Sequence, residues 1–139
     1  MIILDTNVVS ELMKAAPAGR VLGWTAAQPA PALYTTSITQ AEILHGLALL
    51  PAGKRRNALE DAAESMFRED FAGRILPFGS DAARAYARIA ADRRRAGRPI
   101  SQFDAQIAAI ARASGAAIAT RNVSDYDRCG VKVVNPWNA

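Results

Sequence analysis

The sequence predicts an α/β domain of three layers, α/β/α, with a mostly parallel sheet in the middle. Short apolar runs alternate along the chain with longer stretches of helical periodicity, as strands and helices alternate in such domains. The opening run, residues 1–4, is short and uniformly apolar and stops at Asp5, which is typical of a buried parallel strand. A chain of 139 residues, half of them apolar, can bury one core, so we expect a single domain over residues 1–139.

The expected elements follow one another without a repeat or a linker. Strands are predicted at 1–4, 33–36, 74–78, 116–120 and 131–134, where β-forming or small apolar residues are bounded by turn residues. Helices are predicted at 8–13, 19–28, 39–50, 54–71, 80–96 and 101–114. The mixed charges of 54–71 favour an arm that faces solvent or a partner.

Proline, glycine and hydroxyl residues mark the element boundaries. Prolines follow the helices at 19–28, 39–50 and 80–96, Gly115 ends the last helix, and Pro77 favours an edge position for its strand. Thr39 and Glu42 form a T-x-x-E capping box, and Ser101 stands in the same relation to Asp104. Phe103, Ile107 and Ile110 share one helical stripe, and many alanines would let that helix lie close to the sheet.

The composition excludes several kinds of site and location. Cys129 is the only cysteine, which rules out an internal disulfide and a multi-cysteine metal centre and suits a reducing compartment. His45 is the only histidine, so a HExxH zinc site is excluded and a Ser-His-Asp triad would have to use it. No basic segment precedes the apolar start, and the uncharged stretch 21–41 is too polar to span a membrane. We expect a cytoplasmic protein that does not associate with membranes.

The charge balance is basic. Seventeen basic residues, fourteen of them arginine, stand against thirteen acidic residues, giving a net charge of +4. The segment 81–104 carries six arginines and three aspartates. An arginine excess suits a polyanionic partner, but it can equally reflect codon usage, and such a run is usually the solvated face of a helix.

Five oxygen-bearing side chains are predicted at one edge of the sheet. Asp5 ends the first strand, Glu42 and Asp104 each stand in the first turn of a helix, and Asn122 and Asp125 follow the strand at 116–120. Because parallel strands end at a common edge, where ligands bind in open α/β sheets, we expect these side chains to converge.

Simpler interpretations exist for two of these acids. Asp5 or Asn7 can cap the first helix, and a capping box alone explains Glu42. Gly46, one turn after Glu42, leaves room above its carboxylate, while His45 is expected to be a bystander.

Converging carboxylates repel one another unless a cation neutralises them. Oxygen ligands without histidine or cysteine favour Mg²⁺ or Mn²⁺. The helix N-termini are expected to help keep Glu42 and Asp104 ionised. A divalent ion held in this way can activate a water and clamp a phosphodiester, with arginines holding the substrate backbone, so the sequence favours a metal-dependent nuclease.

The chain resembles a known family at four places. The opening Ile-Ile-Leu-Asp-Thr-Asn, the Thr-x-x-Glu of residues 39–42, Asp104, and Thr-Arg-Asn-Val-Ser-Asp-Tyr at 120–126 followed by Val-Asn-Pro-Trp at 134–137 are similar to a PIN domain of the VapC type. The resemblance covers essentially the whole chain, and the order and spacing of the motifs make it specific.

The resemblance implies an endoribonuclease toxin of a type II toxin–antitoxin pair. Such proteins cleave RNA, often tRNA or ribosomal RNA, with Mg²⁺ or Mn²⁺, usually as homodimers. A cognate antitoxin inhibits them by inserting a C-terminal segment into or beside the active-site groove, often with an arginine near the carboxylates. Asp5, Glu42 and Asp104 match the three core acids of the family.

The chain departs from the family pattern at Asn122, where several relatives have aspartate. Asn122 still offers a carbonyl oxygen, and Asp125, the nearest carboxylate, can reach a metal directly or through water. Our hypothesis is one metal held by Asp5, Glu42 and Asp104, and a weaker second metal that binds together with the RNA phosphate.

Two alternatives stay open from the sequence. A phosphatase or receiver domain also begins with a strand that ends in aspartate, but it needs a second aspartate two residues later, where this chain has Asn7. The other alternative is a catalytically degenerate PIN-like module that binds nucleic acid or a partner, which the asparagine at position 122 keeps open.

Overall fold

A five-stranded, fully parallel sheet forms the middle of the computed structural model, which describes residues 1–139. The strands stand in the order β3-β2-β1-β4-β5, and every neighbouring pair is parallel. Their bounds are Ile2–Leu4 (β1), Leu33–Thr36 (β2), Ile75–Leu76 (β3), Ala117–Ala119 (β4) and Val133–Val134 (β5). The predicted parallel sheet is confirmed, and so is the edge position of the strand that precedes Pro77.

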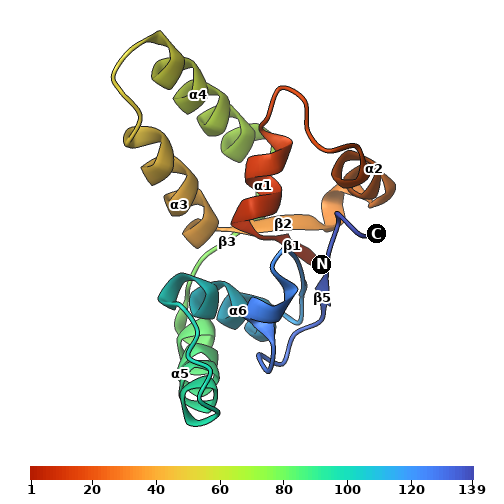
Figure 1. The fold of residues 1–139 in the computed structure, drawn as a ribbon, viewed down its shortest axis with the longest axis vertical. Helices are drawn as coiled ribbons and strands as arrows, with labels where there is room; N and C mark the ends of the chain where they lie inside the picture. The colour runs from red at the N-terminus through yellow and green to blue at the C-terminus, as the bar shows by residue number, and fades with distance from the viewer.

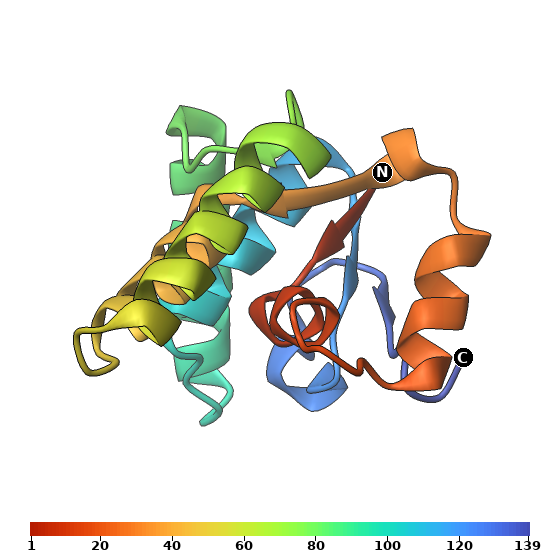
Figure 2. The same cartoon turned by 90° about the horizontal axis from the view of Figure 1, so that it is seen from above.

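Helices cover both faces of this sheet and complete the three layers (Figure 1). One layer contains α1 (Thr6–Leu12), α2 (Gly19–Ala27), α3 (Ser37–Ala48) and α4 (Lys54–Ser65), and the other contains α5 (Ser80–Arg95) and α6 (Gln102–Ser114). Three short helical segments are η1 (Ala30–Ala32), η2 (Met66–Asp70) and η3 (Val123–Tyr126). Seen from above, α3 and α4 lie side by side as a hairpin on one side of α1, and α2 lies on the other side (Figure 2).

The side chains of the central strand alternate between the two cores. Ile3 packs with the cluster under α5 and α6, whereas Leu4 packs with the cluster under α1 to α4. Their partners on β4 alternate in the same register, with Ile3 opposite Ile118 and Leu4 opposite Ala119. This alternation fixes the register of β1 and therefore the position of Asp5 beyond its end.

The alanine-rich helix α6 lies against the sheet as predicted. Ala105, Ala108, Ala109 and Ala111 are at most 1% exposed, because small side chains allow close approach of the backbones. The predicted apolar stripe is wrong at Phe103, which is 51% exposed because it stands in the first turn, before the helix passes beneath the sheet.

The predicted long helix at 54–71 is interrupted. α4 ends at Ser65 and continues as a π-helical turn, η2, which carries Phe67 and Phe71 into the core with their ring centroids 6.3 Å apart. At the end of the predicted solvent-facing arm, therefore, the two phenylalanines are buried while residues 68–70 between them stay exposed.

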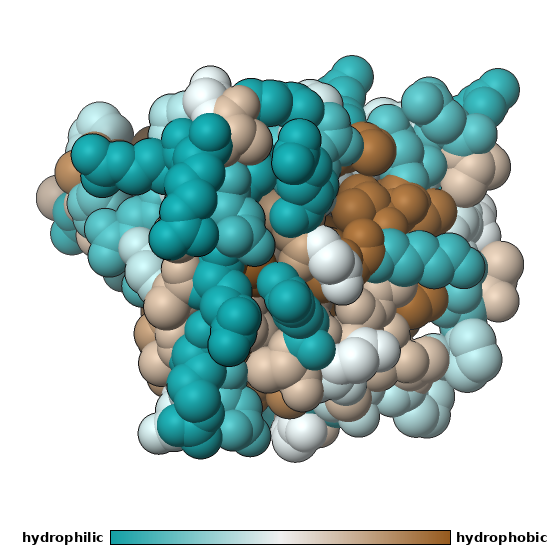
Figure 3. All heavy atoms as spheres, turned by 90° about the horizontal axis from the view of Figure 1, so that it is seen from below, coloured by the Kyte–Doolittle hydropathy of each residue, from teal (hydrophilic) through white to brown (hydrophobic).

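The arginine run of α5 is mostly a solvated face. Arg84, Arg88, Arg94 and Arg95 are exposed, whereas Arg93 is 5% exposed. The face of the molecule seen from below is dominated by hydrophilic side chains beside one compact hydrophobic area (Figure 3). No helix has both the length and the apolar character needed to cross a lipid bilayer.

Candidate active site

The candidate site lies at the topological switch point of the sheet. From the central strand β1 the chain adds β2 and β3 on one side, and then returns to add β4 and β5 on the other. Such a switch point opens a crevice beyond the carboxyl ends of the two central strands. Asp5 follows β1 and Thr120 follows β4, and the Thr120 hydroxyl donates a hydrogen bond of 2.8 Å to Oδ2 of Asp5 across this point.

Asp5 is a buried acid held by hydrogen bonds. It is 5% exposed and accepts from the backbone N–H of Thr6 at 2.8 Å in addition to Thr120. It is the N-cap of α1, as the simpler interpretation proposed, and it also faces the other acids. Burial raises the pKa of Asp5, and the hydrogen bonds from Thr120 and Thr6 partly oppose that rise.

The Thr120 hydroxyl forms three hydrogen bonds, one of them to Asp5. While its hydroxyl donates to Asp5, it accepts from the Asn7 side-chain amide and from the Asn122 backbone N–H, each at 3.1 Å. The Asn7 carbonyl oxygen in turn accepts from the backbone N–H of Arg121 at 3.1 Å. One donated and two accepted bonds satisfy a hydroxyl completely, so the loop after β4 is fixed against the start of α1.

The predicted capping box of Glu42 is wrong. α3 begins at Ser37, immediately after β2, and its N-cap is Thr36, whose hydroxyl accepts from the backbone N–H of Thr39 at 3.1 Å. The helix starts two residues earlier than predicted because Thr36, the last residue of β2, already provides a capping hydroxyl. Glu42 therefore stands in the second turn, beyond the reach of the helix N-terminus.

Thr39 and Thr6 hold Glu42 instead of a capping box. The Thr6 hydroxyl donates to Oε1 of Glu42 at 2.8 Å and lies 3.0 Å from the Thr39 hydroxyl. Since a hydroxyl has a single hydrogen, Thr39 is the donor of the second bond. Thr6 thus connects the helix that Asp5 caps with the side chain of Glu42.

Asp104 occupies the first turn of α6, as predicted. Ser101 caps that helix by accepting from the Asp104 backbone N–H at 3.2 Å. The buried hydroxyl of Tyr126 donates to Oδ1 of Asp104 at 3.4 Å. Burial raises the pKa of Asp104, and the negative charge of Asp125 raises it further.

The three core acids form one electrostatic group. The pKa of Glu42 is raised mainly by burial and also by the charges of Asp5 and Asp104, and the charge of Asp104 contributes to the raised pKa of Asp5. None of the three carboxylates is in an ion pair. Glu42 lies too far along α3 for the helix N-terminus to help keep it ionised, whereas Asp104 stands in the first turn of α6. Burial is the largest cause of the raised pKa at both acids.

The donor set fits a hard divalent cation in its chemistry. The side chains that converge offer carboxylate, amide and hydroxyl oxygens but no histidine nitrogen or cysteine sulfur, which suits Mg²⁺ or Mn²⁺. No three acidic, histidine or cysteine side chains stand close enough to enclose an ion by themselves. An ion held here would therefore need water or substrate oxygens among its ligands, which Mg²⁺ commonly has.

The last two predicted residues lie at the rim. Asn122 and Asp125 are exposed, and neither side chain forms a hydrogen bond with the three core acids. Asp125 lies near enough for its charge to act on Asp104. His45 is exposed and takes no part in the site.

The prediction missed four residues that support the acids: Thr6, Thr39, Thr120 and Tyr126. Each is a hydroxyl residue next to a predicted acid or strand end, and that position is the only signal in the sequence. Tyr126 is the most consequential, since burial raises its pKa and keeps its phenol protonated as a donor between Asp5 and Asp104.

A groove of about 470 Å³ opens beside Glu42. Gly46 lines it one turn after Glu42, which confirms the predicted space above the carboxylate. Its other lining residues come from the α1 end and from the α3–α4 hairpin: Thr6, Ser10, Met13, Lys14, Ala15, Ile43, Leu47, Arg55 and Leu59. The groove therefore joins an apolar floor to an acid of the site.

The PIN domain family matches residues 2–129, which is almost the whole chain. VapC ribonuclease Y4jK of Sinorhizobium fredii is 46% identical over 99% of this chain and 98% of its own length. Toxin FitB of Neisseria gonorrhoeae is 39% identical over 99% of both chains. The crystal structure of FitAcB from that organism superposes with a TM-score of 0.93 at 39% identity and covers all of both chains.

A member of the VapBC family of toxin–antitoxin systems, VapBC-5 from Mycobacterium tuberculosis, superposes with a TM-score of 0.68 at 25% identity over 96% of both chains. The chain belongs to the PIN-domain family and, within it, to the VapC-type toxins of toxin–antitoxin systems. The resemblance that the sequence motifs indicated is confirmed.

Proposed function

We propose that this chain is an endoribonuclease that uses Mg²⁺ or Mn²⁺ and that acts as the toxin of its pair. One observation carries the proposal. Asp5, Glu42 and Asp104 come from three separate elements and have no cationic side chain paired with them, and the charges of Asp5 and Asp104 add to the raised pKa of Glu42. Of the three, Asp5 is buried and Glu42 and Asp104 are partly buried. An unpaired group of such acids costs stability, and a divalent ion is the partner that would offset this cost.

The residues of the chain have distinct roles in this proposal. Asp5, Glu42 and Asp104 would hold the ion, with Asn122 and Asp125 completing a second and weaker position at the rim. A bound divalent ion supplies an activated water and neutralises charge on the phosphodiester. Thr6, Thr120 and Tyr126 keep the carboxylates oriented, which limits the rearrangement needed when RNA arrives.

The test is RNA cleavage by the purified protein free of antitoxin, in Mg²⁺, Mn²⁺ or EDTA, with tRNA and ribosomal RNA as substrates. Glu42→Gln and Asp104→Asn should each lower cleavage by at least about a hundredfold, because a metal contributes several kcal/mol and each ~1.4 kcal/mol is a factor of ten. Glu64→Gln, which removes one exposed carboxylate from α4, is the matched control. Intact RNA under every metal condition, with RNA still bound, would instead favour a degenerate binding module.

We further propose that the cognate antitoxin occupies the groove beside Glu42. The solved structures of this fold include a VapBC member of the toxin–antitoxin systems and the FitAcB structure. An apolar segment fits the floor formed by Met13, Leu47 and Leu59, and a cationic side chain at its end would meet Glu42. Such a segment would block the approach of RNA to the acids.

The family resemblance also carries the proposal of a homodimer. Light scattering on the purified toxin tests it, and a mass of about 14.8 kDa, that of one chain, would exclude it at the concentration used.

A further inference from the structure

Arg93 is the one arginine of α5 that is buried. It is 5% exposed, whereas Arg94 and Arg95 beside it face solvent. A buried guanidinium is costly unless all of its charge is matched by hydrogen bonds, so its partners indicate what it stabilises.

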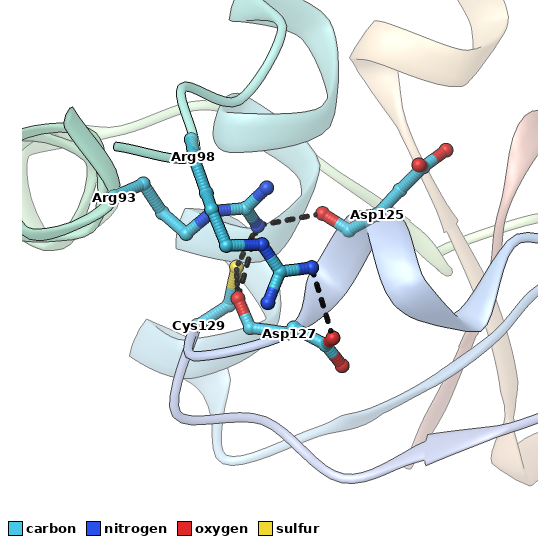
Figure 4. Close-up of polar contacts among 5 residues, drawn as sticks. All are labelled: Arg93, Arg98, Asp125, Asp127 and Cys129. Atoms are coloured by element: carbon cyan, nitrogen blue, oxygen red, sulfur yellow. Dashed lines mark hydrogen bonds and ion pairs between the residues drawn. The ribbon is translucent and has the colours of Figure 1, made fainter. Parts of the chain in front are cut away.

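Those partners are backbone carbonyls of two separate loops (Figure 4). Nε donates to the carbonyl of Arg98 at 2.7 Å, and Nη1 donates to the carbonyls of Asp125 and Asp127 at 2.8 and 2.9 Å. The Cys129 sulfur lies 3.7 Å from the same Nη1. No carboxylate is paired with Arg93, and the Asp125 carboxylate points away from it. Arg93 therefore binds backbone carbonyl groups rather than an acidic side chain.

The two carbonyls that Nη1 binds flank Tyr126. Tyr126 is 2% exposed, and its hydroxyl donates to Asp104 and also interacts with Asp5. Fixing the peptide groups on both sides of Tyr126 fixes the position of its phenol. The third carbonyl, that of Arg98, lies just before Ser101, which caps the helix that carries Asp104.

We propose that Arg93 is a positioning residue, which sets the spacing between Asp5 and Asp104 by holding Tyr126 and the start of α6. The proposal rests on the proposed nuclease function. A planar guanidinium with donors in a fixed fork can bind three carbonyls at once, whereas a lysine ammonium cannot span the two loops.

The main test compares Arg93→Lys with wild type in Mn²⁺ affinity, measured by calorimetry on the purified toxin, and in the kinetics of RNA cleavage. We expect the variant to fold, to bind Mn²⁺ about 10–100-fold more weakly and to lose kcat by a similar factor, because the groups that orient the proposed metal ligands are altered. KM for RNA should change little, because the surface that would bind RNA is unaltered.

Two control variants separate positioning from a general loss of stability. Arg98→Gln removes the exposed ion pair that joins Arg98 to Asp127 across the two loops but leaves the Arg98 carbonyl that Arg93 binds. Ile89→Val loosens the core on the same helix, one turn before Arg93. Both controls should retain the Mn²⁺ affinity of wild type.

A double-mutant cycle with Tyr126→Phe tests whether Arg93 acts on the acids by positioning Tyr126. If Arg93 acts through Tyr126, adding Arg93→Lys to Tyr126→Phe should weaken Mn²⁺ binding much less than adding it to wild type. Full additivity, or wild-type Mn²⁺ affinity and kcat in Arg93→Lys, would overturn the proposal. A wild-type protein that neither binds Mn²⁺ nor cuts RNA would instead show that the proposed function is wrong.

Discussion

Hydroxyl groups, rather than cations, hold the acids of the candidate site. Thr120 supports Asp5, Thr6 supports Glu42, and Tyr126 supports Asp104. A hydroxyl can orient a carboxylate without neutralising its charge, so the acids stay available to a cation from solution. Their raised pKa values show the consequence, because burial and mutual repulsion are only partly offset.

The raised pKa of Glu42 predicts a stabilising substitution. A carboxyl whose pKa is higher in the folded than in the unfolded protein contributes stability that is fully present below the unfolded pKa and is lost as the pH rises through the folded pKa. Glu42→Gln keeps an oxygen to accept from Thr6 and removes the charge. In EDTA at neutral pH it should raise the free energy of unfolding by up to about 1 kcal/mol, after allowance for solvent screening.

Urea unfolding at neutral pH and at about pH 4, near the usual pKa of glutamate, measures this effect. The gain should disappear at the lower pH, where wild-type Glu42 is itself largely protonated. If Glu42→Gln destabilises the metal-free protein equally at both pH values, the pKa of Glu42 is not raised by burial.

At the scale of elements, the start of α3 decides where Glu42 points. Because Thr36 caps the helix directly after β2, Glu42 falls in the second turn and on the same side as Thr6. With Thr39 as the cap, Glu42 would instead stand in the first turn. The cap thus fixes both the helix and one acid of the site.

Thr36→Ala should destabilise the protein by about 1 kcal/mol or somewhat more, because an N-cap bond is lost at a fully buried position. Denaturant unfolding gives the change in free energy. Thr36→Ser retains the capping oxygen and should recover most of the loss. Equal destabilisation by alanine and serine would indicate that the buried methyl group, rather than the cap, is responsible.

At the scale of the whole molecule, the sheet places the candidate site and the groove side by side. Glu42 belongs to both, since it faces the acids and also lines the groove between α1 and the α3–α4 hairpin. The hairpin therefore links partner binding to catalysis in the proposed toxin. A ligand of the groove would change the surroundings of an acid without moving the sheet.

Leu59 lies on the groove side of α4, and its position leads to a prediction about antitoxin binding. Leu59→Asp should weaken binding of the cognate antitoxin protein by about 2 kcal/mol, or roughly thirtyfold, because an apolar contact is replaced by a charge. RNA cleavage should stay unchanged. Leu22→Asp, on an exposed leucine of α2 outside the groove, is the control.

Binding is measured by calorimetry and inhibition by the loss of RNA cleavage on adding that protein. If Leu59→Asp and Leu22→Asp bind it equally well, the antitoxin does not use this groove.

Local pattern was enough to predict the layers and the sheet edge at which the three candidate acids lie. The uniformly apolar β1 and the alanines of α6 predicted which segments are buried, and the strand and helix ends predicted the edge at which Asp5, Glu42 and Asp104 lie. These features depend on periodicity and on parallel connection, which neighbouring residues in the sequence determine.

The support of those acids depended on residues far apart in the chain. Thr6 and Glu42 are 36 residues apart, and Thr120 and Asp5 are 115 residues apart. The sequence by itself determined an α/β domain with acids at one sheet edge, because binary pattern and turn residues act locally. Only the tertiary structure decided that Thr36 caps α3, that burial raises the pKa values of the three carboxyl groups, and that Arg93 turns inward among the arginines of its helix. Each of these results from competition among groups that meet only after folding.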